Sequence, residues 1–237
     1  MKWGTRYGAD FANRLYSMVK RHVTGDLRFV CFTDDATGLD DGIEALPLPE
    51  MDLPERVAWS PWRKVSLWQE PLADLQGDAL FLDLDIVVTG SLDDLFDYSP
   101  GDYCVIHNWT QPFEKVGNTS VFRFPIGKHN HIFDDMAADP QKILSKYKIE
   151  QQYISGEIAS QVFWPKEWCI SFKQNCVPFW PLNFFKVPPL PKSARVVIFS
   201  GYPDPDQALV GEYPVKKAWK KLYKHVLPTP WIGEHWR

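Results

Sequence analysis

The chain has 237 residues, 45 % of them hydrophobic, which fits one large folded domain or a closely fused pair of lobes and excludes a disordered chain. Its formal net charge of −4 gives no electrostatic basis for binding nucleic acid. No apolar run is long enough to span a bilayer and Met1 opens no signal peptide, so a cytoplasmic protein is expected.

The expected elements, taken in chain order, indicate an α/β fold. A strand at 1–3, a helix at 11–22 and a strand at 28–32 form the opening of a parallel α/β unit. A proline-rich loop at 47–61 leads to a helix at 64–75 that Pro71 interrupts, then to a buried central strand at 78–82 and a short helix opened by the capping-box signature at 91–94. Strands at 103–106 and 119–124 follow, and then helices at 132–138, 141–147 and 150–161. The rest of the chain is an irregular aromatic stretch at 163–191, a last strand at 195–199 and a last helix at 214–226. No internal repeat and no linker divides the chain.

The four cysteines indicate neither a metal site nor a disulfide framework. Their spacings match no zinc-binding pattern, and three of them lie in apolar, strand-like surroundings. Reduced and mostly buried thiols are therefore expected. These residues are Cys31, Cys104, Cys169 and Cys176.

Asp83 and Asp85 directly follow the apolar strand at 78–82. Ligands of open α/β sheets bind at the carboxyl ends of strands, where two carboxylates one residue apart can share a hard cation such as Mn²⁺ or Mg²⁺. Such a cation would neutralise a diphosphate and assist its departure. A pair of solvated surface acids is the alternative, but the apolar residues on both sides favour a metal site, because buried carboxylates need partners.

Four sequence blocks and one residue pair carry a resemblance to a known family. The blocks are 3–7 (Trp-Gly-Thr-Arg-Tyr), 62–68, 80–96 and 118–122, and the pair is Glu150-Gln151. In this order they resemble glycosyltransferase family 8, the glycogenin and bacterial galactosyltransferase group, and within it a bacterial branch. The similarity extends over 3–209 and is most specific at 80–96, which ends in Ser-Leu-Asp-Asp-Leu-Phe.

The resemblance implies a single α/β domain with the Rossmann-like glycosyltransferase A fold, in which helices flank a mixed central sheet. It divides the chain into a nucleotide-sugar-binding half at 1–125, an acceptor-side half at 126–213 and a basic helix with its tail at 214–237.

The resemblance also implies a role for each matching residue. In the first block, Tyr7 would pack on the uracil base and Thr5 would belong to the same nucleotide-binding segment. Lys64 would reach the nucleotide, and Asp83 would contact both the donor and the metal, which it shares with Asp85. Asn118 would hydrogen-bond the donor sugar. Glu150 and Gln151 would lie near the anomeric carbon, whereas the alternative for both is an ordinary polar helix N-terminus.

Two departures from the family pattern affect the metal site and the first strand. Ser200 stands where the family has a third metal ligand, a histidine, and the following Lys-Pro-Trp is replaced by the segment 203–206. Because serine is a poor ligand for Mn²⁺, a water or a nearby acid such as Asp204 would have to complete the shell, or the metal affinity is low. The first strand is also short, because little precedes Trp3. Either the sheet tolerates a short edge or translation starts further upstream.

The resemblance implies transfer of a hexose from a nucleotide sugar, UDP in the family, to a hydroxyl of a saccharide, glycolipid or protein acceptor, with retention of configuration. One alternative is a catalytically silent nucleotide-sugar-binding protein, for which Ser200 is the best argument. A second is a phosphatase resembling the haloacid dehalogenases, whose first motif the segment 80–87 mimics. That motif normally lies near the N-terminus, and the other motifs of that superfamily are not evident.

The segment 214–226 has the composition of a basic amphipathic helix. Apolar residues recur at helical spacing on one face, and five lysines occupy the other. Such a helix can bind peripherally to the inner, anionic face of a membrane. The alternative, favoured slightly, is that the apolar stripe packs on the domain and the lysines are merely solvated.

Overall fold

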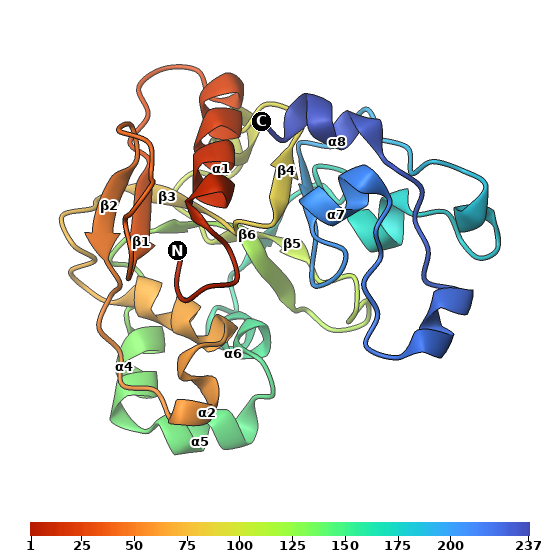
Figure 1. Ribbon diagram of the computed structural model, residues 1–237. Helices are drawn as coiled ribbons and strands as arrows, with labels where there is room; N and C mark the ends of the chain where they lie inside the picture. Colours follow the sequence, from red (N-terminus) through yellow and green to blue (C-terminus); the bar gives the residue numbers. More distant parts are fainter.

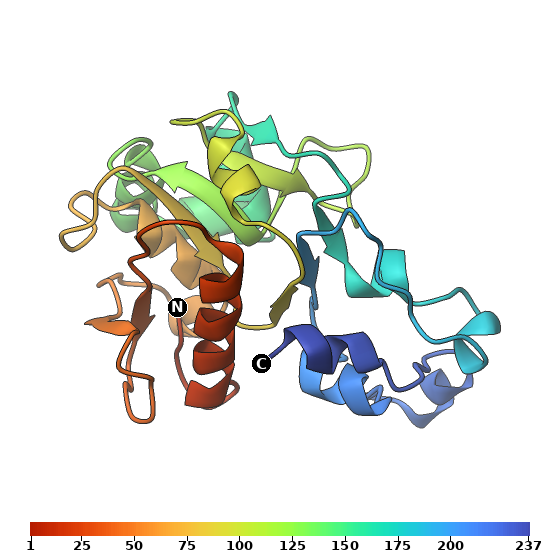
Figure 2. The ribbon, with the colours of Figure 1, turned by 90° about the horizontal axis from the view of Figure 1, so that it is seen from above.

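The computed structural model describes residues 1–237 and contains nine strands in three hydrogen-bonded sheets (Figures 1 and 2). The first sheet is the parallel pair β1 (Val30–Thr33) and β2 (Glu44–Pro47). The second has the order β3 (Asp78–Leu82), β6 (Gly117–Pro125), β5 (Cys104–His107) and β7 (Val162–Phe163). The third has the order β4 (Ile86–Val88), β9 (Val196–Ile198) and β8 (Cys169–Ser171).

The two larger sheets combine parallel and antiparallel pairs, which confirms the mixed α/β class. In the second sheet only β5 and β7 are parallel, and in the third only β8 and β9. Two details differ from the sequence expectation. The strands do not form one continuous sheet, and β3 lies at the edge of its sheet, with Phe81 as its only fully buried residue.

Apart from α1 and α3, the α-helices lie in two groups (Figure 1). The helices α2, α4, α5 and α6 gather at one end of the molecule, whereas α7 and α8 lie at the opposite side with the C-terminus. The helices are α1 (Ala9–His22), α2 (Glu55–Ala58), α3 (Asp93–Asp97), α4 (His131–Ala138), α5 (Pro140–Lys146), α6 (Glu150–Glu157), α7 (Pro205–Val210) and α8 (Pro230–His235). Short helices of other types are η1 (Pro61–Trp68), η2 (Phe172–Cys176), η3 (Leu182–Phe184) and η4 (Ala218–Leu222).

Local sequence explains the ends of the helices that carry the site. The expected helix at 11–22 is present as α1, which buries Leu15, Met18 and Val19 at helical spacing. The expected helix at 64–75 is instead the 3₁₀ helix η1. It begins at Pro61, where the Ser60 hydroxyl accepts a hydrogen bond from the Trp62 amide. It ends before Pro71, because proline lacks an amide hydrogen and disfavours helical backbone at the residue before it.

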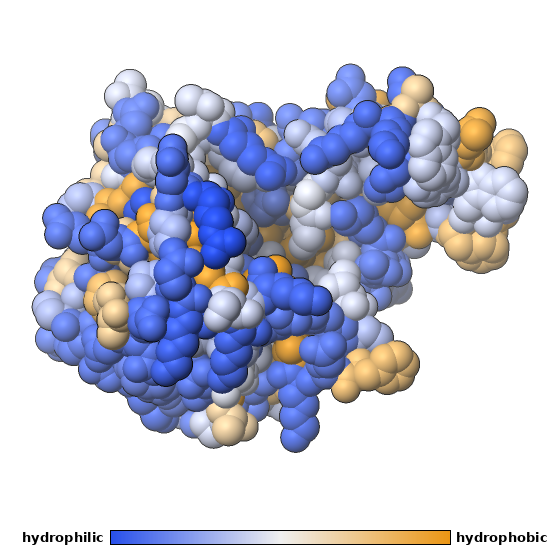
Figure 3. Space-filling model, turned by 90° about the horizontal axis from the view of Figure 1, so that it is seen from below, coloured by the Kyte–Doolittle hydropathy of each residue, from blue (hydrophilic) through white to orange (hydrophobic).

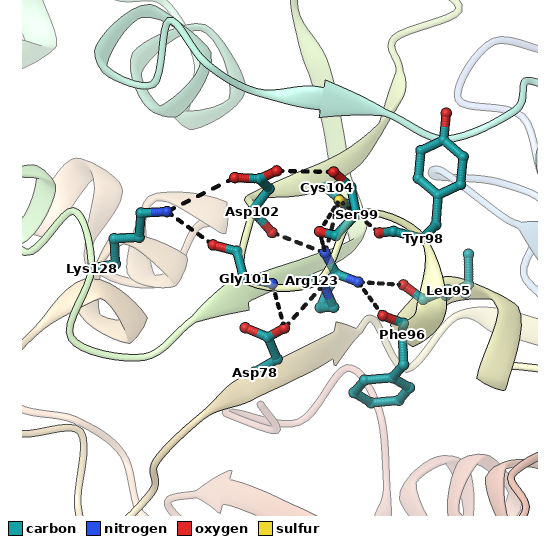
Figure 4. A network of polar contacts seen from close by, with 10 residues as sticks. All are labelled: Asp78, Leu95, Phe96, Tyr98, Ser99, Gly101, Asp102, Cys104, Arg123 and Lys128. Atoms are coloured by element: carbon teal, nitrogen blue, oxygen red, sulfur yellow. Dashed lines mark hydrogen bonds and ion pairs between the residues drawn. The ribbon is translucent and has the colours of Figure 1, made fainter.

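Arg123 is a buried cation on β6 that connects the end of α3 and the turn after it to the sheet (Figure 4). Its guanidinium donates to the carbonyls of Leu95 and Asp102 at 3.1 and 3.2 Å, and also to those of Phe96 and Ser99. The Asp78 carboxylate on β3 lies 3.7 Å from its Nε, an ion pair rather than a hydrogen bond. A single side chain therefore satisfies carbonyls at the end of α3 and in the turn that follows it.

The segment 214–226 does not form the expected amphipathic helix. It contains only the five-residue η4, and Trp219 and Leu222 are 58 % and 74 % exposed. The expectation that the apolar stripe packs on the domain is wrong for these residues. Lysines three and four residues apart repel one another along a helix, and no side chain caps its start at Lys217. Instead, Trp180 donates to the Leu222 carbonyl at 3.1 Å, so a neighbouring loop satisfies this backbone.

The four cysteines are free and buried, which agrees with the sequence expectation. None of the helices combines the length and the hydrophobicity that crossing a bilayer requires.

Candidate active site

The aspartate pair lies on the link between β3 and β4, where two sheets meet. The amide of Asp83 donates to the Ser120 carbonyl on β6 at 2.8 Å. The carbonyl of Asp85 accepts from the Phe199 amide, just after β9, at 3.1 Å. Leu84 between them is buried, so the alternation of side chains sends both carboxylates to the opposite side. The backbone thus fixes both aspartates to neighbouring sheets.

Lys64 on η1 pairs with the first aspartate. Its Nζ lies 2.8 Å from the Asp83 carboxylate and donates to the Thr119 carbonyl at 2.9 Å. Lys64 is only 5 % exposed, whereas the Asp83 side chain is 22 % exposed. The lysine therefore holds Asp83 in place from beneath and leaves the carboxylate within reach of solvent.

Tyr7 connects the second aspartate to a third carboxylate. Its hydroxyl lies 3.1 Å from Asp85 Oδ2 and 3.2 Å from Asp204 Oδ1, and Arg6 Nη2 donates to the same Asp204 oxygen at 3.2 Å. A phenol has a single proton, so Tyr7 can donate to only one of the two carboxylates at a time. The other is then left without that hydrogen bond.

Burial and mutual repulsion disfavour the charged forms of these carboxylates. Burial raises the pKa of Asp85 to about 7, and the charge of Asp83 adds to the effect. Burial also raises the pKa of Asp204, although Arg6 opposes the shift. Asp204 has a structural role as well, because it caps α7 through a reciprocal capping box with Gln207.

The chemistry of these carboxylates fits a hard divalent cation, which would relieve their repulsion and use the oxygen that Tyr7 leaves unpaired. No three His, Cys, Asp or Glu side chains are grouped as a complete metal-binding set. Asp83 and Asp85 would therefore need further oxygen ligands.

A polar cavity of about 230 Å³ is lined in part by Lys173, whose ammonium Asp85 and Asp204 attract. Eight of its ten lining residues are polar, which suits a hydroxyl-rich ligand. It brings together three residues that the sequence singled out, Asn118, Gln151 and Ser200. The remaining lining residues are Asn108, Trp109, Thr110, Ile149, Ser171 and Gln174.

Gln151 is held in the cavity by a buried asparagine. Asn108 Nδ2 donates to Gln151 Oε1 at 2.7 Å, while Asn108 Oδ1 accepts from the amide and hydroxyl of Thr110 at 2.9 and 2.8 Å. This chain of hydrogen bonds fixes the orientation of the Gln151 amide and leaves its nitrogen available to a ligand. Sequence reasoning did not find Asn108, because an asparagine after a strand carries no motif of its own.

The other expected residues lie at different depths. Glu150 is 4 % exposed and accepts from the Thr119 hydroxyl at 2.8 Å, beneath the cavity rather than in its lining. Asn118 is buried, and its Oδ1 accepts from the Ser120 amide at 3.1 Å. Thr5 is exposed on the loop before α1. The Tyr7 ring packs on Phe11, with ring centroids 4.8 Å apart, and beneath the Arg6 guanidinium.

Lys173 is a cavity residue that sequence reasoning missed. Its ammonium donates to the carbonyl of Ser200. Burial lowers the pKa of Lys173 and the positive Lys224 adds to this shift, while Asp85 and Asp204 attract the ammonium and oppose it. The lysine therefore links the cavity electrostatically to the carboxylates. It lies in the stretch at 163–191, where no periodicity or motif marked it.

The sequence matches no protein-family model and no curated protein. The structure, by contrast, has the glycosyltransferase A fold. The galactosyltransferase LgtC, solved in complex with donor and acceptor sugar analogs, has a TM-score of 0.58 at 14 % identity, and the match covers 83 % of this chain and 85 % of that one. The glycosyltransferase GlyE of Streptococcus pneumoniae TIGR4 has a TM-score of 0.58 at 12 % identity, covering 86 % of this chain and 55 % of that one. The bifunctional glycosyltransferase WbbM has a TM-score of 0.56 at 12 % identity, covering 83 % of this chain and 44 % of that one.

Proposed function

We propose that the chain is a glycosyltransferase that moves a hexose from a nucleotide sugar, UDP in the first instance, to a hydroxyl of a saccharide, glycolipid or protein. The observation that carries the proposal is the junction of Asp83 and Asp85 with a polar cavity that contains Gln151 and Lys173. A nucleotide-sugar donor requires carboxylates that bind a metal cation, a positively charged side chain near its phosphates and amides that hydrogen-bond its sugar hydroxyls.

Asp83 and Asp85, with Asp204 nearby, would hold the Mn²⁺ or Mg²⁺. When bound, this cation supplies positive charge to the diphosphate and makes it a better leaving group. Lys173 adds a second positive charge from the lining of the cavity, where it can stabilise the charge that develops on the leaving phosphate. Asn118 and Gln151 orient the sugar.

Retention of configuration fits a reaction on one face of the sugar. No carboxylate lines the cavity, and Glu150 is buried and accepts a hydrogen bond from the Thr119 hydroxyl, so the cavity lining offers no carboxylate nucleophile for a covalent intermediate. The bond from the anomeric carbon to the phosphate oxygen would break as the acceptor oxygen bonds to the same face. The acceptor proton would pass to the departing phosphate. The oriented Gln151 amide can stabilise the positive charge that develops on the sugar.

A nucleotide-sugar-binding protein without catalysis is the second candidate. Ser200 is exposed at the cavity and provides no strong metal ligand. This candidate predicts donor binding without turnover, so the two functions can be separated by measuring both.

The test measures UDP binding by calorimetry with and without Mn²⁺, and UDP release from a panel of UDP-hexoses. Asp85→Ala should abolish the Mn²⁺-dependent part of UDP binding and the release of UDP. Asp26→Ala is the matched control, because Asp26 is an exposed loop aspartate with no ion pair. Equal UDP affinity in wild type and Asp85→Ala would overturn the metal role. Binding without release from any UDP-hexose, in the presence of candidate acceptors, would favour the second candidate.

A further inference from the structure

Asp204, the third carboxylate of the candidate active site, is already bound by donors of the protein itself. Its Oδ1 accepts from the Tyr7 hydroxyl and from Arg6 Nη2, both at 3.2 Å, and its Oδ2 lies 3.5 Å from the same Arg6 nitrogen. The Asp204 side chain is only 10 % exposed, and its amide donates to Gln207 Oε1 at 2.9 Å, which fixes the backbone. Asp85, by contrast, accepts a single hydrogen bond on its side chain, from Tyr7. Asp204 is therefore the more strongly occupied of the two carboxylates that Tyr7 joins.

Arg6 is a cation that binds Asp204 at one nitrogen and keeps its other donors free. The Arg6 side chain is 54 % exposed, and only its Nη2 has a hydrogen-bond partner, although a guanidinium carries five N–H donors. The guanidinium lies over the rings of Tyr7 and Tyr202, 4.8 and 5.7 Å from their centroids. Burial disfavours its charge, but the acidic groups around it outweigh burial and raise the pKa of Arg6. Arg6 is thus a permanent positive charge held beside the carboxylates.

Arg6 and a divalent cation would compete for Asp204. A hard cation binds carboxylate oxygens at about 2.0–2.6 Å, whereas Arg6 Nη2 already lies 3.2 Å from Asp204 Oδ1. A metal ion on the same carboxylate would therefore lie within a few ångström of the guanidinium, where like charges repel even at high dielectric constant. Metal binding that uses Asp204 is favoured only when Arg6 moves away.

A phosphate group offers Arg6 another partner. Guanidinium groups bind phosphate oxygens through two parallel hydrogen bonds, which an exposed arginine with free donors can form. The diphosphate of a nucleotide would bind beside the cation held by Asp83 and Asp85. The Tyr7 hydroxyl joins Asp85 to the Asp204 oxygen that Arg6 holds, so Arg6 lies close to that position.

We propose that Arg6 is a built-in competitor of the divalent cation: it holds Asp204 in the nucleotide-free protein and moves to a phosphate oxygen when the nucleotide binds, which leaves Asp204 to the cation. This rests on the proposed function, since it takes the ligand to be a nucleoside diphosphate group. Removal of Arg6 then has two effects of opposite sign. The cation alone should bind more tightly, whereas the nucleotide should bind less tightly. In the intact chain, each ligand should strengthen the binding of the other by the same factor.

The first experiment measures Mn²⁺ binding to the 237-residue chain by calorimetry, with no nucleotide or sugar present. Arg6→Gln should tighten Mn²⁺ binding by about tenfold, because it removes a positive charge a few ångström from the metal. Arg6→Lys keeps the charge and should bind Mn²⁺ more weakly than Arg6→Gln. Arg56→Gln is the matched control, because Arg56 is exposed and has no ion pair, and it should leave the Mn²⁺ affinity within about twofold of wild type. A site that was merely loosened by the loss of Arg6 would bind Mn²⁺ less tightly, so tightening separates competition from a structural role.

The second experiment measures UDP binding with and without saturating Mn²⁺. With Mn²⁺ present, Arg6→Gln should weaken UDP binding by about tenfold or more, because a charge-assisted hydrogen bond to phosphate is lost. The factor by which Mn²⁺ strengthens UDP binding should fall as well, since the two ligands are linked. Arg56→Gln should change neither quantity.

Unchanged or weaker Mn²⁺ binding in Arg6→Gln would overturn the proposal, and so would an undiminished affinity for UDP. The Mn²⁺ measurement contains no nucleotide, so its result does not depend on catalysis. A chain that shows both effects of Arg6→Gln but releases no UDP from any UDP-hexose would support the role of Arg6 and overturn only the proposed sugar transfer.

Discussion

Replacing Lys173 with Gln tests the least expected residue of the candidate site. Its ammonium lines the polar cavity, contacts the Ser200 carbonyl and is attracted by Asp85 and Asp204. The substitution keeps the approximate length and polarity of the side chain but removes its charge. If the ammonium contacts the donor phosphates, the variant loses a charge-assisted hydrogen bond, which contributes about 1.5–3 kcal/mol. This corresponds to a loss of about 10- to 150-fold in UDP affinity.

The fold should tolerate this change. The pKa of Lys173 is lower in the folded chain than its ordinary value, mainly because of burial. A base with a lowered folded pKa disfavours folding at pH values where the unfolded chain is protonated. Removing the charge therefore relieves a cost at neutral pH, and the Tm of Lys173→Gln should be equal to or higher than that of wild type.

The assay is calorimetric titration with UDP in the presence of Mn²⁺, followed by kcat/KM for UDP release with the best UDP-hexose. Lys166→Gln is the matched control, since Lys166 is exposed and outside the cavity. Lys173→Gln should weaken UDP binding, and Lys166→Gln should leave it unchanged. Equal losses in both variants would show a general effect of net charge, and unchanged affinity in Lys173→Gln would refute the phosphate contact.

Three further predictions concern other parts of the molecule. Arg123→Met should lower the free energy of unfolding, measured by urea unfolding, by about 3–5 kcal/mol. The substitution leaves several buried carbonyls without a hydrogen-bond donor and Asp78 without its ion-pair partner. A loss below about 1 kcal/mol would contradict this prediction. Ser200→His should tighten Mn²⁺ binding in calorimetry, because imidazole is a better ligand than a hydroxyl, and unchanged affinity would mean that another group already fills the position. We also propose that the exposed Trp219 and Leu222, with the lysines around them, contact anionic membranes. The protein should then co-sediment with anionic vesicles at low salt, and less so when these lysines are changed to glutamine; a wild type that stays in the supernatant would refute the contact. The lysines are Lys216, Lys217, Lys220, Lys221 and Lys224.

The hydrophobic pattern of the sequence was sufficient to predict the bounds of elements that depend on neighbouring residues alone. The strand at 78–82 and the helix at 11–22 were predicted at or near their observed bounds, because each has a clear period and clear stop signals. The helix predicted at 214–226 is absent, although its hydrophobic pattern was as regular. Lysine repulsion along the helix axis and hydrogen bonds from the loop with Trp180 outweigh helix propensity there. Hydrophobic periodicity shows that a segment could form an apolar face, but it does not show which part of the protein covers that face.

Exposed aromatic residues lie next to that segment and come from the stretch 163–191, for which the sequence predicts irregular structure. Phe179 and Phe185 are 75 % and 77 % exposed, and Asn183 between them donates to the Tyr223 carbonyl at 2.9 Å. Figure 3 shows hydrophobic residues gathered at the protruding tip on the right of the view, and a hollow between this protrusion and the rest of the molecule. No local signal connects residues forty positions apart, so this patch exists only in the folded chain.

By itself, the sequence determined the α/β class of the fold and the strand that precedes the aspartate pair. These features depend on residue type and on spacing over fewer than about ten positions. The roles expected for Lys64, Asn118 and Gln151 depend instead on the resemblance to a known family. Only the tertiary structure decided that Tyr7 lies between Asp85 and Asp204, that Lys173 lines the polar cavity, and that β1 and β3 line an apolar cavity. Tyr7 and Asp204 are 197 positions apart, and contacts of this kind are set by how sheets and loops pack together rather than by any pattern in the neighbouring residues.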